Sequence, residues 1–115
     1  MSIHPTRNRQ RLLICLLGGR IQPAAMTAIV TKPHVIACVV SADQPIAAER
    51  LLELLQERNM ACDPAPVVTV PATSALQTAE AVRSLIAAYP GADPQISLTG
   101  APMPMGVGAC EAARR

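Results

Sequence analysis

The chain has 115 residues and a formal net charge of +2, which is the size expected of one small domain. Apolar residues make up 50% of it, so it can bury a core and is not expected to be disordered. The chain has no Trp, no Phe and a single Tyr, and its charges nearly balance. These features exclude an aromatic stacking surface for single-stranded nucleic acid and purely electrostatic binding to long nucleic acid.

The N-terminal segment predicts neither secretion nor membrane insertion. Residues 1–10 are polar and are expected to form a flexible basic leader. The apolar run over residues 12–17 is broken by Gly18, Gly19 and Arg20, so it is too short for a signal peptide. No apolar run approaches the roughly 20 residues of a membrane span, so we expect a cytoplasmic protein with no membrane partner.

Short apolar runs alternate with helical patterns along the rest of the chain. Because the runs are mostly continuous rather than alternating, they are typical of parallel strands covered on both faces. The pattern therefore predicts an α/β fold over residues 11–115, a Rossmann-like parallel sheet of about four strands with helices on both faces. A sheet this thin indicates either a domain incomplete at its C-terminus, within a larger protein, or a surface covered by a partner chain. The predicted strands are residues 12–17, 35–40, 67–70 and 96–99.

The first two helices are predicted from their starting residues. Pro23 suits the first turn of a helix over residues 24–30. For the next helix, Asp43 is predicted to cap the N-terminus and Pro45 to open the first turn. This second helix has one apolar stripe and one charged face, which is predicted to lie in solvent. The stripe is Ala47, Leu51, Leu54 and Leu55, and the charged residues are Glu49, Glu53 and Glu57.

The last two helices are predicted in the same way. Ser74 and Gln77 have the spacing of a capping box at the start of a third helix, along which apolar residues recur as far as Tyr89. Tyr89 is predicted to pack against the core. A fourth helix is expected to begin near Pro104.

Neither the cysteines nor the histidines predict a metal site. The cysteines form no C-x-x-C pair, and Cys15 and Cys38 lie inside apolar runs, where they are expected to be small buried hydrophobes. His4 and His34 have no third ligand at a suitable spacing. We therefore predict no metal and no cofactor.

The loops that follow the strands are the candidate binding site, because ligands of open parallel sheets bind at the carboxyl ends of the strands. In the first loop, Gly18 and Gly19 allow a close backbone approach, Arg20 supplies a cation, and the next helix offers free N–H groups to an anion such as phosphate. The alternative is a plain tight turn with Arg20 in solvent. The loops are residues 18–23, 41–43, 71–74 and 99–103.

The other loops offer ligand contacts but no catalytic set. Thr99 and Gly100 could give a hydroxyl and a backbone N–H to a phosphate or ribose, or could form a plain turn. Ser41 could polarise a ligand, yet neither it nor Thr99 has an identifiable base partner. No nucleophile elbow and no zinc-protease motif occurs, so the sequence favours binding of a phosphorylated small molecule over acid–base chemistry.

Two segments resemble a known family. The stretch LLICLLGGRIQP, followed by a helix, a strand and VVSAD, resembles the start of CARF domains, the CRISPR-associated Rossmann fold, particularly those fused to restriction-endonuclease-like nucleases. The closing ISLTGAPMPMGVGACEAARR resembles the family's strand, TGGTK and small-residue helix. Together the two motifs cover nearly all of residues 11–115.

The resemblance implies a homodimer that binds a cyclic oligoadenylate, the second messenger of type III CRISPR systems, and regulates a fused or separate nuclease effector in antiviral defence. By position, the first ligand loop would comprise Gly18, Gly19, Arg20 and Gln22, and the last would comprise Thr99, Gly100 and Ala101. Where the family usually continues Gly-Thr-Lys, this chain has Ala101-Pro102-Met103, which lacks the hydroxyl and the cation.

Two other functions remain open. The first is a ring nuclease that cleaves the messenger in the same pocket, with Ser41 or Thr99 orienting a ribose hydroxyl. The second is a Rossmann-like domain that binds another nucleotide, or an interaction domain without a ligand.

Overall fold

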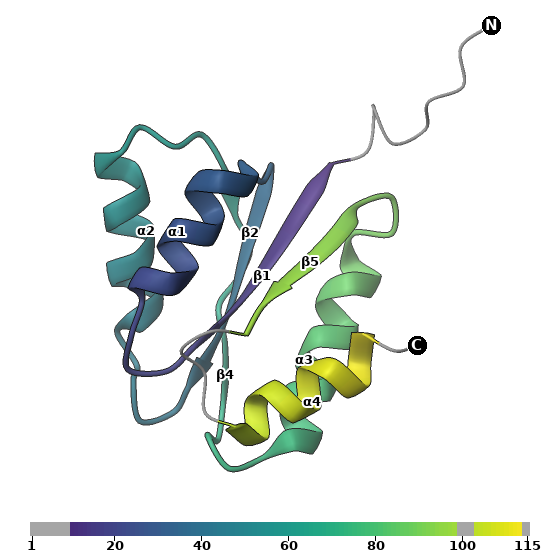
Figure 1. The fold of residues 1–115 in the computed structure, drawn as a ribbon. Coiled ribbons are helices and arrows are strands. Elements are labelled where there is room, and N and C mark those ends of the chain that lie inside the picture. The colour runs from purple at the N-terminus through teal and green to yellow at the C-terminus, as the bar shows by residue number, and fades with distance from the viewer. Residues whose placement is uncertain (1–9, 99–102, 114–115) are drawn as a thin grey trace, which may run out of the picture.

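The computed structural model describes residues 10–98 and 103–113. Strands and helices alternate along the chain, as the apolar pattern predicts (Figure 1). Within the described residues, no helix is both long enough and apolar enough to cross a membrane. The elements are β1 (Arg11–Leu17), α1 (Gln22–Thr31), β2 (Val35–Ser41), α2 (Ala47–Glu57), β3 (Asp63–Pro64), β4 (Val68–Val70), α3 (Ala75–Ala88), β5 (Asp93–Ser97) and α4 (Met103–Ala113).

The five strands form one sheet in which every pair is parallel. The order is β3-β2-β1-β5, and β4 also pairs with β2. Because β3 pairs with the start of β2 and β4 with its end, the two short strands share one position and the sheet is four strands wide. Helices α1 and α2 cover one face and α3 and α4 the other, so the predicted fold class is confirmed (Figure 1).

The core has one layer on each side of β1. Leu12, Ile14 and Leu16 face α3 and α4, whereas Leu13 and Leu17 face α1 and α2. All five are at most 1% exposed, since helices cover both faces of the strand. A continuous apolar run is therefore what this central strand requires.

Arg11 links the start of the sheet to the end of α1. Its Nε donates to the carbonyl oxygens of Thr31 and Lys32, both at 3.1 Å. Lys32 has the left-handed φ of 51° that commonly ends a helix. The Arg11 backbone N–H also donates to His34 Nδ1 at 2.9 Å, so both side chains have structural roles.

Three details differ from the prediction. β5 begins at Asp93, three residues before the predicted strand, because exposed polar positions at a sheet edge carry no apolar signal. The strand β3 was not predicted, since two exposed residues leave no pattern. α2 begins at Ala47, so Pro45 lies in the preceding turn and does not open the helix.

Candidate functional site

The carboxyl ends of the strands lie along one edge of the sheet because all the strands are parallel. The chain leaves β1 to form α1 and β2 on one side, while β5 pairs with β1 on the other. Cys15 is level with Ser97, the last residue of β5, so the chain leaves β5 beside the last residues of β1, which continues to Leu17. This is the point where the strand order reverses and where open parallel sheets bind ligands.

The first loop presents an exposed cation beside a helix N-terminus. Gly18 is buried, whereas Gly19 and Arg20 are exposed. Gln22, also exposed, is the first residue of α1, and the N-cap Ile21 provides no side-chain hydrogen bond. No hydrogen bond or ion pair joins Arg20 to the part of the chain that the structure describes. Its guanidinium and the open end of α1 are therefore available to an anion.

The second loop differs from the prediction at Asp43. This carboxylate accepts a hydrogen bond from the Ser41 hydroxyl and does not cap α2, whose N-cap is Ile46. The predicted capping role is therefore wrong, because the helix begins too far along the chain for Asp43 to reach it. Ser41 is fully buried, and its hydroxyl holds Asp43 at the exposed edge. The Ser41 side chain itself does not face solvent.

The third loop has a structural role at Ser74. Its Oγ accepts the N–H of Gln77 at 3.1 Å, which confirms the predicted cap of α3. The remaining predicted site residues, Thr99, Gly100 and Ala101, lie outside the described residues.

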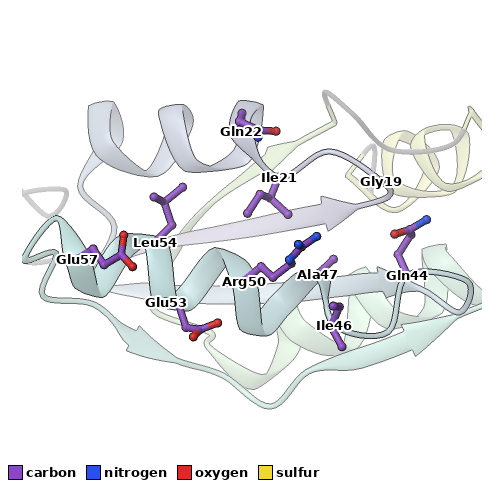
Figure 2. Close-up of a pocket in the computed structure, with 10 residues that line it drawn as sticks. All are labelled: Gly19, Ile21, Gln22, Gln44, Ile46, Ala47, Arg50, Glu53, Leu54 and Glu57. Carbon is purple, nitrogen blue, oxygen red and sulfur yellow. The ribbon is translucent and has the colours of Figure 1, made fainter.

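A groove of about 430 Å³ lies between α1 and α2 and opens at the first loop (Figure 2). It contains two residues of the predicted site, Gly19 and Gln22. It also contains Gln44 and Arg50, which are not among the predicted site residues. Gln44 lies against the first loop, since its Nε2 is 3.8 Å from where a Cβ on Gly19 would stand. The groove residues are Gly19, Ile21, Gln22, Gln44, Ile46, Ala47, Arg50, Glu53, Leu54 and Glu57.

A sequence signal for Arg50 was present. It follows Ala47 by three residues and precedes Leu54 by four, so the three share one side of α2. The predicted apolar stripe on that side thus includes one cation. Gln44 has a weaker signal, since it is the residue after the predicted second loop.

The predicted burial of two cysteines is confirmed. Cys15 and Cys38 are 0% and 2% exposed, and burial raises the pKa of both thiols, that of Cys38 to about 12. Thiols protonated to this extent are poor nucleophiles. Among residues 10–98 and 103–113, no group of three His, Cys, Asp or Glu side chains could hold a metal ion.

The fold resembles that of a solved protein. No protein-family model and no curated protein sequence matches the chain. Among solved structures, it is similar to Can2 from Sulfobacillus thermosulfidooxidans in complex with cyclic tetra-adenylate, with a TM-score of 0.80 and 15% identity. The match covers 90% of this chain and 29% of that one, so the chain spans less than a third of the neighbour's length. The likeness in fold agrees with the Rossmann-like α/β fold that the sequence resemblance implied.

Proposed function

We propose that this chain is a sensor domain that binds a cyclic oligoadenylate and, as a homodimer, regulates an antiviral CRISPR effector. The proposal has the ligand bound at the carboxyl edge of the sheet. Its site comprises Gly18, Gly19, Arg20 and Gln22 from the first loop, Ser41 as the residue that positions Asp43, and the segment Thr99, Gly100 and Ala101 after β5.

The observation that carries the proposal is the fold. A chain with the same fold over 90% of these residues was solved with cyclic tetra-adenylate bound. The pairing of β1 with β5 adds support, because these neighbouring strands belong to the two segments that carry the family resemblance. The first of these motifs has an exposed arginine and an open helix N-terminus, which suit a phosphate.

A dimer suits a ring of phosphates. Two copies of one anion-binding edge facing each other across a two-fold axis would present the same donors to opposite phosphates of the ring. One ring would then occupy two chains.

The first test is titration calorimetry of the full chain with cyclic tetra-adenylate and cyclic hexa-adenylate, with linear oligoadenylate as the control. We expect one of the rings to bind at one ring per two chains. Absence of heat with both rings, from a chain shown to be folded by circular dichroism, would overturn the proposal. Competition by ordinary nucleotides alone would favour a different nucleotide-binding function.

The ring nuclease is tested in the same samples. Ser41, the only described residue proposed for that chemistry, has its hydroxyl buried and bound to Asp43, which does not favour attack on a ligand. We therefore expect chromatography to recover an intact ring after long incubation. Linear products that accumulate with time would identify an enzyme.

Arg20 is the residue to test for the phosphate contact. If the guanidinium binds a ligand phosphate, Arg20→Ala removes a charge-assisted hydrogen bond worth about 1.5 to 3 kcal/mol and weakens binding about tenfold or more. The matched control is Arg58→Ala. Arg58 is also exposed, but it follows the far end of α2, away from the carboxyl edge. Equal affinity of the wild type and Arg20→Ala would reject the assignment.

A further inference from the structure

The groove between α1 and α2 has its donors at one end. In Figure 2, Gly19 and Gln44 lie at the end that opens at the sheet edge, whereas Leu54 and Glu57 lie at the other. From Arg50 to Glu57 the helix axis advances about 10 Å, so the cation and the last carboxylate are well separated. The end of the groove near the proposed ligand is therefore basic, and its two carboxylates, Glu53 and Glu57, follow about one and two turns farther along α2.

Two helix N-termini meet at the basic end. The N-cap residues of α1 and α2 are Ile21 and Ile46, and both line the groove. Neither has a side chain that caps the helix. The Ala47 N–H of α2 donates to the Gln44 carbonyl oxygen at 3.2 Å, whereas the other N–H groups of the two first turns have no side-chain acceptor among the described residues. The partial positive charges of both helices thus add to that of Arg50.

The side chain of Arg50 has no hydrogen-bond or ion-pair partner in the described part of the chain. Its side chain is exposed, and neither a hydrogen bond nor an ion pair joins it to Glu53, although the two residues are three apart on one helix. Gln22 and Gln44 line the same groove. An unpaired guanidinium, two neutral amides and two open helix ends are the donor set that binds a phosphate.

We propose that Arg50 and Gln44 bind a phosphate of the nucleotide ligand, with one adenylate unit entering the groove and its base directed toward Leu54. This inference rests on the proposed function for the identity of the ligand. The cavity of about 430 Å³ falls within the range of small-molecule sites. Glu53 and Glu57 repel a second phosphate and can accept a hydrogen bond from the exocyclic amino group of adenine, so they set the direction in which the unit enters.

The test uses two ligands and one matched pair of variants. Calorimetry measures the affinity of the full chain for cyclic tetra-adenylate, and NMR follows the side-chain signals of Gln44 and Arg50 on addition of AMP. We expect Arg50→Ala to weaken ring binding about tenfold and to make its salt dependence shallower, because one phosphate contact is lost. Arg58→Ala should change neither quantity, and all three proteins should have the same melting temperature.

The outcomes separate the two proposals. If the wild type binds the ring and Arg50→Ala binds it equally well with the same salt dependence, the inference is wrong and the proposed function stands. If the ring does not bind but AMP shifts the Gln44 and Arg50 signals, the nucleotide groove stands and the proposed messenger is wrong. If neither ligand binds, both are wrong. A third variant, Arg50→Lys, should keep part of the affinity that Arg50→Ala loses, since it keeps the charge but loses the bidentate geometry.

Discussion

At Gly108, the packing of α4 on α3 leaves no room for a side chain. A Cβ added there would stand 2.1 Å from the carbonyl oxygen of Ala75, which is backbone and cannot rotate away. We predict that Gly108→Ala lowers the free energy of unfolding by about 1 to 3 kcal/mol through overpacking. Chemical denaturation of the purified chain measures the change.

Gly106 provides the control on the same helix. A Cβ added there meets no atom within 4 Å. Gly106→Ala should therefore raise the free energy of unfolding by up to about 1 kcal/mol, because Ala has the higher helix propensity. Opposite signs for two Gly→Ala changes in α4 would establish the close helix contact. Equal effects would show that α4 does not pack against Ala75 at Gly108.

The buried thiols predict how stability depends on pH. Burial raises the pKa of Cys38 from an ordinary value near 9.0 to about 12, so the folded state keeps the proton when the unfolded chain has lost it. The contribution of this thiol is full below pH 9 and is lost between about pH 9 and pH 12. Within that window, the titration of Cys38 lowers the free energy of unfolding by about 1.4 kcal/mol per pH unit.

Cys38→Ala tests that dependence. The variant should be less stable at pH 7 because of the cavity, but its stability should fall less steeply from pH 9 to pH 10.5 in denaturant titrations. If the stabilities of the wild type and the variant fell in parallel with pH, the raised pKa assigned to the Cys38 thiol would be contradicted. Cys110→Ala is the control, because this thiol is exposed.

At the scale of single elements, α3 depends on its N-cap. Ser74 is the one predicted cap that the structure confirms, and its Oγ accepts the Gln77 N–H. We expect Ser74→Ala to lower the free energy of unfolding by about 1 kcal/mol and Ser74→Asp to restore most of it. Ser84→Ala, an exposed change within the same helix, should have almost no effect in the same denaturation assay.

The elements differ in how well the sequence predicted them. The central strands β1 and β2 and the helices α1 and α3 are built from long apolar patterns or clear caps, so their positions were predicted closely. β3 and the start of β5 are exposed and pair only through the backbone, which leaves no side-chain pattern. The start of α2 was placed too early because a capping residue and a proline also occur in ordinary turns.

The candidate site was predicted in part for a related reason. Glycines and an arginine after a strand mark a loop by local composition alone, and the structure describes Gly19 and Arg20 as exposed at the sheet edge. Gln44 and Arg50 share a groove with Gly19 only because α1 and α2 pack side by side, which is a tertiary contact. The local sequence pattern of a helix does not predict which other helix it packs against.

For the molecule as a whole, the strand order predicts where backbone hydrogen exchange is slowest. Strands β1 and β2 have partners along both edges, whereas β5 pairs only with β1 among the described residues. Residues Asp93, Pro94 and Gln95 of β5 are also exposed. The β1 amides should therefore exchange only on global unfolding, and those of β5 through local opening.

Hydrogen exchange monitored by NMR at low protein concentration tests this order of exchange rates. Repeating the measurement at higher concentrations tests whether a second copy of the chain covers the β5 edge. If exchange at β5 stays fast at every concentration, its edge is open and the proposed dimer forms through another surface. If exchange at β5 slows to the β1 rate as the concentration rises, while β1 is unchanged, a second copy covers this edge. Exchange that is fastest at β1 would contradict the central position of that strand, on which its pairing with both β2 and β5 depends.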